Sequence, residues 1–211
     1  MTKQLRSEHT RARLVRSAAE LFDQHGFAGT NISDITKAAG VTKGALYFHF
    51  QAKEELVEAV QDQSCAKLGT AVASLDDVSA VQALIDLTHT LAGWLGSDPV
   101  VRASFRVGRE CGDRGRPFLD FYLSWSAAAT GLLTRAARDG QLADEVSVPV
   151  VAVAVLALSV GIESLCSSGF SGAETTTLLA DAWRLFLPGL VGTARVGEFM
   201  PEGTLTRIPQ D

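Results

Sequence analysis

Apolar residues recur along this chain at intervals of three and four positions, which is the spacing of one face of an α-helix. Leu14, Ala18 and Phe22 follow this spacing and predict a first helix over about residues 7–25, with charged residues on its other face. Gly26 is expected to end that helix, because glycine adopts the left-handed C-terminal conformation without a Cβ clash.

Two shorter helices are predicted directly after the first one. Thr30 or Asn31 is expected to cap the second helix by accepting a free backbone N–H of its first turn, and Gly40 ends it. Thr42 then caps a third helix, after the sharp turn that Gly40 permits. Short helices joined by a glycine turn predict a helix-turn-helix motif over about residues 31–50.

Beyond this motif the apolar pattern stays helical. The remaining expected helices cover about residues 54–73, 78–95, 99–108, 117–139, 147–168 and 173–192. No segment alternates between apolar and polar residues over a convincing length, and no turn resembles a hairpin turn. We therefore predict an all-α fold of about nine helices, with a three-helix N-terminal head and a C-terminal helical bundle.

The longest apolar run lies at about residues 148–162. It falls short of the ~20 residues that span a bilayer, so we predict a buried helix and no membrane partner. The N-terminus is polar and basic, unlike a secretory signal. The three cysteines are odd in number and far apart, which argues against a disulfide framework and favours a reducing cytoplasm.

The charge of the chain is divided unevenly between its two ends. The whole chain carries a net charge of −5. Residues 1–53 hold eight Lys and Arg against four Asp and Glu, a net charge of +4, so the remainder carries −9. A basic head on an acidic body attracts phosphates locally while the body stays away from a nucleic acid.

The head resembles the tetracycline-repressor (TetR) family of transcriptional regulators. The resemblance rests on three motifs: Ala18-Ala19-x-Leu21-Phe22-x-x-x-Gly26-Phe27, Thr30-x-Ile32-x-x-Ile35, and the run Gly40–Phe50 followed by Lys53-Glu54. Within that family the chain is similar to the γ-butyrolactone autoregulator receptors of actinomycetes. That similarity rests on the runs Gly44–Phe50 and Asp98–Ala103 and on Tyr122-x-x-Trp125.

The resemblance implies a division of the chain by function. We expect a DNA-binding domain at residues 1–53, a ligand-binding and dimerisation domain at 54–195, and a flexible tail at 196–211. The expected partners are a double-stranded, near-palindromic DNA operator, a small γ-butyrolactone-like inducer and a second copy of the chain. The helices at about 148–168 and 173–192 are the expected dimer interface, although an apolar stripe also suits a monomer core.

The residues expected to contact DNA lie on or beside the third helix: Thr42, Lys43, Gly44, Tyr47, His49 and Lys53. Lys43 stands in the first turn, which reaches deepest into the major groove, and its ammonium donates to the N7 and O6 acceptors of guanine. Gly44 lets the backbone approach the duplex. Tyr47 donates its hydroxyl to a phosphate or places its ring on a thymine methyl, and the other three suit phosphates. For Tyr47 and His49 the alternative is packing within the head.

The residues expected to bind the inducer come from the helices at about 78–139: Trp125, Tyr122, Phe105, Val101, Leu91, Trp94 and Phe118. The resemblance implies that Trp125 lines the lactone site, because the receptors carry a tryptophan in this stretch. Its indole offers an apolar face and one N–H donor. Each of the other residues also suits an ordinary core.

No catalytic residue, metal site or cofactor is expected. The four histidines are scattered, no cysteine pair has zinc-ligand spacing, and no glycine-rich phosphate loop follows a strand. The sequence thus predicts a ligand-responsive repressor and not an enzyme. Two alternatives stay open: a look-alike of the same group that answers to antibiotics or other metabolites, and a small-molecule carrier that does not bind DNA.

Overall fold

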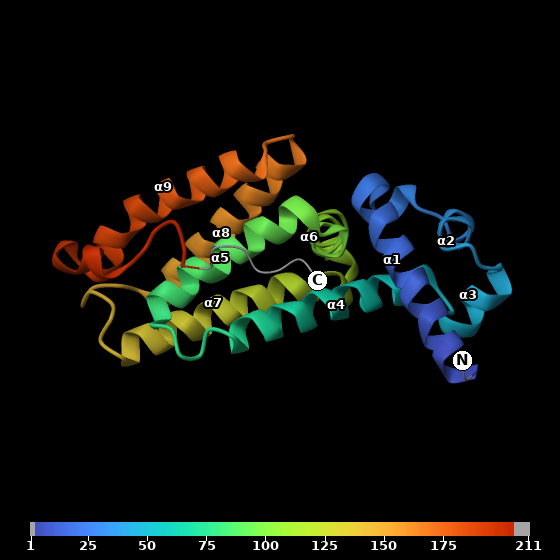
Figure 1. Cartoon of the computed structure of the whole chain (residues 1–211), viewed down its shortest axis with the longest axis horizontal. Helices are drawn as coiled ribbons and strands as arrows, with labels where there is room; N and C mark the ends of the chain where they lie inside the picture. The colour runs from blue at the N-terminus through green and yellow to red at the C-terminus, as the bar shows by residue number, and fades with distance from the viewer. Residues whose placement is uncertain (1–2, 205–211) are drawn as a thin grey trace. The chain divides into compact units, whose positions relative to one another are not determined.

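The computed structural model describes residues 3–204, and every regular element within that range is a helix (Figure 1). Nine α-helices lie in this part of the chain: α1 (Lys3–Gly29), α2 (Ile32–Ala39), α3 (Lys43–His49), α4 (Lys53–Ala73), α5 (Ala80–Ser97), α6 (Pro99–Cys111), α7 (Asp120–Arg138), α8 (Val148–Ser167) and α9 (Gly172–Val191). Three 3-10 turns accompany them: η1 (Gly112–Arg114), η2 (Arg116–Phe118) and η3 (Thr193–Glu198). The predicted all-α fold is confirmed.

The helices form two compact units. One contains the chain up to residue 67 together with residues 98–123, and the other contains residues 68–97 together with the chain from residue 124 onward. Neither boundary coincides with the expected division between residues 53 and 54. The reason is that α4 continues from the head without a break and α6 packs against α1.

The ends of the first three helices follow the local sequence signals closely. Gly26 has a φ of 72° and interrupts α1, which then continues for one more turn. Asn31, rather than Thr30, caps α2 by accepting the N–H of Asp34 at 3.0 Å. The hydroxyl of Thr30 donates instead to the carbonyl oxygen of Gly26, 2.8 Å away. Gly40, with a φ of 60°, ends α2 in the left-handed conformation.

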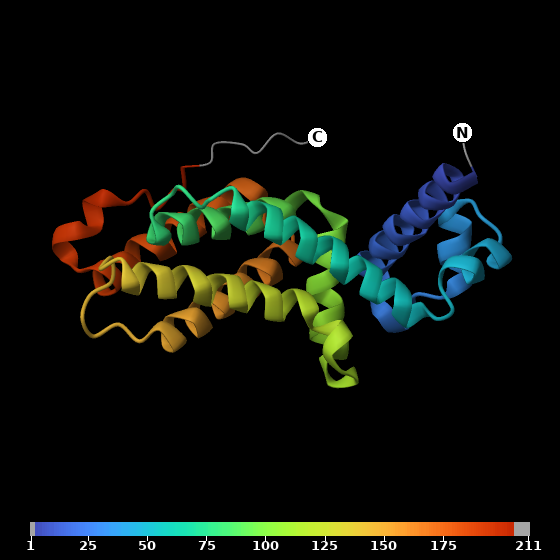
Figure 2. The ribbon, with the colours of Figure 1, turned by 90° about the horizontal axis from the view of Figure 1, so that it is seen from below.

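One hydrophobic core joins α1–α4 to α6, and Figure 2 shows α1, α2 and α3 as a cluster at the N-terminal end of the chain. From α6 this core receives Ala103, Val107 and Cys111. Polar contacts also join α6 to α1: Arg102 pairs with Asp23 at 2.8 Å, and Arg106 donates to the Asp23 carbonyl at 2.6 Å. The N-terminal head is therefore built together with α6.

In the second unit α5 packs against α8 and α9, and most of its residues are buried. The indole N–H of Trp183 on α9 donates to the hydroxyl of Thr88 on α5 at 2.8 Å. Trp183 is itself almost completely buried. These contacts make α5 the central helix of this unit.

The structure corrects the expectation of a buried helix at the longest apolar run. α8 is long and apolar enough to cross a membrane by length and composition alone, and only 28% of its most apolar stretch is buried. Val150 and Val153 are about two-thirds exposed, because they lie on the face that points away from α5 and α9. Ala157 and Gly161 continue that exposed face.

The expected flexible tail also differs from the structure. Residues 196–204 are fixed by contacts with the second unit: η3 ends at Glu198, Phe199 is buried, and the backbone of Met200 bonds to the side chain of Gln82. The remainder of the expected tail, residues 205–211, lies outside the described residues.

Candidate nucleic-acid interface

α3 is a short helix that is held firmly at its first residue and along its inner face. The hydroxyl of Thr42 accepts the N–H of Ala45 at 3.1 Å, which caps the helix as the sequence predicts. Leu46 and Phe50 are buried in the head core. Lys43 is the first residue of α3 and is exposed. The helix is thus rigid on one side and open to a partner on the other.

The exposed face of α3 carries the residue types expected for reading DNA. Lys43 and Gly44 are exposed, and the ring of Tyr47 is about half exposed. This face therefore presents the ammonium of Lys43, the bare backbone of Gly44 and the phenol of Tyr47. This arrangement offers donors to base edges and phosphates, with room for the backbone to approach a duplex.

Phe48 is an exposed residue of α3 that was not among the predicted DNA contacts. Its side chain is 76% exposed, and its ring meets the edge of the His49 ring, with centroids 5.0 Å apart. His49 is half buried, and its ring lies beside those of Phe48 and Phe50. Part of the His49 side chain therefore packs within the head, as the alternative interpretation expected. The available signal was helical spacing, because Phe48 lies opposite the buried Leu46 and Phe50.

Arginines from α1 hold the helix-turn-helix in place. Arg13 donates to the Ala39 carbonyl at the end of α2, and a Cβ added at Gly40 would lie 2.8 Å from the same guanidinium. Arg11 lies over the ring of Phe50, 5.1 Å from its centroid. Part of the positive charge of the head is therefore used for internal contacts.

Lys53 does not share the exposed surface of α3, and its expected phosphate contact is corrected. Its ammonium donates to the carbonyl oxygens of Phe27 at 2.7 Å and Thr30 at 2.8 Å, and it lies 4.0 Å from the centroid of the Phe27 ring. Burial is the main cause that lowers the pKa of Lys53, and nearby Arg114 adds to it. Lys53 thus clamps the end of α1 to the start of α4.

This clamp gives a prediction about stability. Replacing Lys53 by methionine keeps the apolar stem but leaves the two carbonyls without their charged donor, a loss of about 1–2 kcal/mol. The midpoint of thermal unfolding, followed by circular dichroism, should fall by about 2–6 °C. Lys37→Met, which removes an exposed lysine of the same head, should leave the midpoint unchanged. Weaker DNA binding by Lys53→Met at an unchanged midpoint would instead make Lys53 a DNA contact.

The residues expected to bind the inducer fall in both compact units. Val101, Phe105, Phe118 and Tyr122 belong to the first unit, and Leu91, Trp94 and Trp125 belong to the second. Their assembly into one ligand site stays a prediction.

In the first unit the expected ligand residues are already engaged with one another and with the head. The rings of Phe105 and Tyr122 have centroids 4.8 Å apart, and the Tyr122 hydroxyl donates to the Phe105 carbonyl at 3.4 Å. Phe118 packs edge-on against Phe27, 5.3 Å between centroids, and belongs to the head core. Phe118 is therefore explained by packing in the head rather than by a ligand wall. Val101 is completely buried.

In the second unit Trp125 is completely buried on α7, and its indole N–H donates to the hydroxyl of Ser159 on α8 at 3.0 Å. That donor was expected to serve a ligand. That donor is thus used within the unit, and a role of Trp125 in ligand binding stays a prediction. Leu91 is buried and Trp94 is partly buried on α5.

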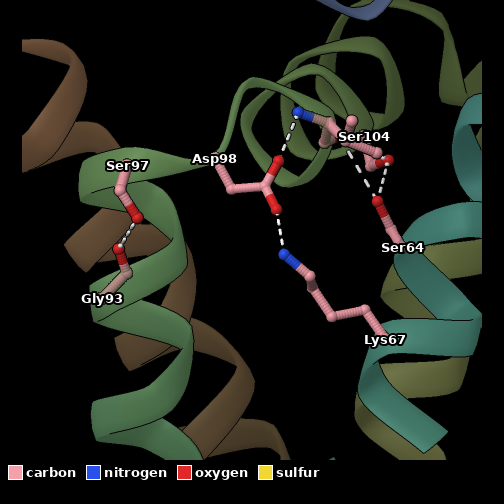
Figure 3. Close-up of polar contacts among 7 residues, drawn as sticks. Ser64, Lys67, Gly93, Ser97, Asp98 and Ser104 are labelled. Atoms are coloured by element: carbon pink, nitrogen blue, oxygen red, sulfur yellow. Dashed lines mark hydrogen bonds and ion pairs between the residues drawn. The ribbon is translucent and has the colours of Figure 1, made fainter. Parts of the chain in front are cut away.

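A polar network that the sequence did not predict connects α4 to α6 within the first unit, and it is buried at Gln61, Ser64 and Ser104. Ser64 and Ser104 share a hydrogen bond of 2.8 Å, and Lys67 pairs with Asp98, the residue that caps α6 (Figure 3). Gln61 donates to the Phe118 carbonyl at 3.0 Å and accepts the N–H of Phe121 at 3.1 Å. Any shift of α6 therefore acts directly on α4, the helix that follows the helix-turn-helix.

Comparison with known proteins agrees with this geometry. Residues 14–60 match the family described as bacterial regulatory proteins, tetR family, and residues 78–192 match the tetracyclin repressor-like C-terminal domain. The A-factor receptor protein of Streptomyces griseus is 30% identical over 210 residues, which is 100% of this chain and 74% of that protein.

Solved structures give the same result over most of the chain. A crystal structure of a γ-butyrolactone receptor (ArpA-like protein) is 30% identical, covers 94% of this chain and 95% of its own, and has a TM-score of 0.77. The TetR-family protein CprB of Streptomyces coelicolor, in complex with its biological operator sequence, is 32% identical over 92% of this chain and 94% of its own, with a TM-score of 0.78.

The capped helix-turn-helix and these matches together identify the chain as a DNA-binding transcriptional regulator. The chain belongs to the TetR family of bacterial regulators, and it is related to γ-butyrolactone receptors. Regulators of this family bind operator DNA, form dimers and respond to small-molecule ligands.

Proposed function

We propose that this protein is a cytoplasmic repressor that binds a near-palindromic operator as a dimer and leaves it when a γ-butyrolactone-type ligand binds. The exposed face of α3 carries the proposal, because Lys43, Gly44 and Tyr47 present groups suited to the major groove on a helix fixed by its cap and core. One such helix contacts too few bases for useful specificity, so two copies must read two half-sites.

The exposed apolar face of α8, together with that of α9, supports a second copy of the chain as the partner. On α9 Leu178 is 44% and Leu185 80% exposed, and they fall on one helical face with Gly189. On α8 the exposed face is formed by small apolar residues, which let another helix approach closely. Large exposed apolar faces of this kind are typical of interfaces.

Relatedness to the A-factor receptor and to other γ-butyrolactone receptors supports a ligand of that type. The buried indole of Trp125 offers an apolar face against which a lactone ring or acyl chain would pack. The ligand can change the spacing of the two heads only if it binds the dimer with one spacing more tightly than the dimer with the other. The contacts of Ser64 and Gln61 with Ser104 of α6 make α4 the helix through which that preference would reach the head.

Trp125 gives a direct prediction about the ligand. Alanine would leave a large cavity at this fully buried position, so Trp125→Phe is the better variant because it keeps an aromatic ring. We expect Trp125→Phe to bind the operator as well as the original protein, and to need at least about tenfold more lactone for release. The measurement is a mobility-shift titration with ligand. Loss of operator binding by a folded variant would contradict the role.

The function itself is tested by a mobility-shift assay with a pool of genomic DNA fragments. The assay is repeated with γ-butyrolactone-type extracts and with aromatic antibiotics. Release by the lactones supports the proposal, whereas release by the antibiotics alone identifies a look-alike of the same group. A protein that retards no fragment at any salt concentration would be a carrier, because operator binding should strengthen steeply as salt is lowered.

A further inference from the structure

The chain after α9 returns to the central helix of the second unit and lies along a polar stripe on it. Gln82, Asp86 and His89 are spaced four and three residues apart, so they share one face of α5. α5 is otherwise largely apolar and buried. We name residues 200–204, which follow the buried Phe199 and meet this stripe, the strap.

The side chains of the stripe form hydrogen bonds mainly with backbone groups of the strap. The amide of Gln82 accepts the N–H of Met200 at 2.8 Å and donates to the Met200 carbonyl at 3.2 Å. Nε2 of His89 bonds to the Pro201 carbonyl at 2.8 Å, and in this contact the ring nitrogen donates. Asp86 accepts the N–H of Thr204 at 2.7 Å and also accepts its hydroxyl.

The strap also reaches α9, so it bridges two helices. Glu202 pairs with Arg184, which directly follows Trp183 on α9. Trp183 in turn bonds to Thr88 of α5. Strap and tryptophan thus fasten the same pair of helices by separate contacts.

Asp86 makes the attachment of the strap nearly all-or-none. It is completely buried, and a buried carboxylate is costly unless hydrogen bonds satisfy it. Two of the three donors that reach its oxygens belong to Thr204, and Gln82 supplies the third at 2.9 Å. When Thr204 leaves, water must reach Asp86 in its place. Met200, Glu202 and Thr204 are themselves exposed, so the strap is held chiefly by polar contacts.

We propose that the strap is a detachable latch, and that its release from the stripe on α5 is the first step by which the second unit opens. Segments with few buried apolar contacts open at lower free energy than packed helices do. Release removes the bridge between α5 and α9, and the bond between Trp183 and Thr88 then breaks more often. Thr204 therefore sets how frequently the unit opens, although it is an exposed residue near the end of the described chain.

The test is hydrogen exchange of the tryptophan indole N–H groups in the full chain, measured by nuclear magnetic resonance. Thr204→Val removes one donor to Asp86 without touching the core. We expect the indole of Trp183 to exchange at least about tenfold faster, the usual effect of losing a hydrogen bond to a charged group. The indole of Trp125, which bonds to Ser159, should keep its rate.

Two further variants sharpen the test. Gly203→Ala should also accelerate exchange of the Trp183 indole N–H, because it weakens the attachment of the strap. Gly203 has a φ of 78°, and an added Cβ would lie 3.1 Å from the His89 ring. Thr176→Val is the matched control, since the Thr176 hydroxyl bonds within α9 to the Gly172 carbonyl at 2.7 Å. Unchanged exchange of Trp183 in both strap variants would overturn the proposal. Equal acceleration of Trp125 and Trp183 would overturn it too, because the unit would then open as a whole.

Discussion

Lys43→Ala is expected to weaken operator binding by about 30-fold or more, with no change in the midpoint of thermal unfolding. Each well-placed contact to a guanine edge contributes about 1–3 kcal/mol of discrimination, and a dimer loses two such contacts. Stability should not change, because Lys43 is exposed at the first residue of α3 and the cap is supplied by Thr42. The measurement is a fluorescence-anisotropy titration with the operator and with a scrambled duplex.

The control for Lys43 removes a charge from the head at another exposed position. Arg16 on α1 pairs with Glu20 at 3.2 Å, and its side chain is 77% exposed. Arg16→Ala should change binding to operator and scrambled DNA by the same factor, since a charge that does not read bases acts on both. If Lys43→Ala also weakens both duplexes equally, Lys43 contacts phosphate and does not read sequence.

Leu185→Glu is expected to convert the dimer into a monomer and to lower operator affinity by at least about 100-fold. Leu185 is 80% exposed on the apolar face of α9, and a carboxylate there would have to be buried in the interface without a partner. Operator affinity falls because a monomer engages only one half-site and loses the effective concentration that the dimer provides. Sedimentation velocity gives the oligomeric state, and anisotropy gives the affinity.

Leu123 provides the matched control for Leu185. It is 46% exposed on α7, outside the apolar faces of α8 and α9. Leu123→Glu should therefore remain a dimer with full operator affinity. A dimeric Leu185→Glu protein would show that the interface lies on another surface.

Local signals in the sequence predicted the helices and their ends well. The caps at Thr42 and Gly40 depend on residues within one turn of the helix end, so they are visible in the sequence itself. The expected helix at 117–139 corresponds to α7, and its first turn differs because η2 occupies residues 116–118.

Contacts between distant segments were not visible in the sequence. Lys53 has the position of a phosphate-binding residue, but its ammonium is directed to carbonyls more than twenty residues earlier. Phe118 suits a ligand wall by composition, yet it packs on Phe27 because α6 docks on α1. The polar contacts of the strap with α5 join residues 112 or 118 positions apart, and no local sequence pattern predicts them.

The exposure of α8 was mispredicted for a related reason. An apolar stretch indicates burial, but it does not say whether the partner is the same chain or another copy. The small residues Ala157 and Gly161 on the exposed face were the available signal, since they suit close packing between helices.

We propose that the protein reads a near-palindromic operator as a dimer and leaves it when a lactone binds. The most direct test is to recover genomic fragments bound by the purified protein and to footprint the strongest one with and without γ-butyrolactone. We predict two protected half-sites whose centres lie about 34–36 Å apart, or a multiple of that distance, and loss of both when lactone is added. Bound fragments that share no sequence, or a footprint that no small molecule removes, would contradict the account.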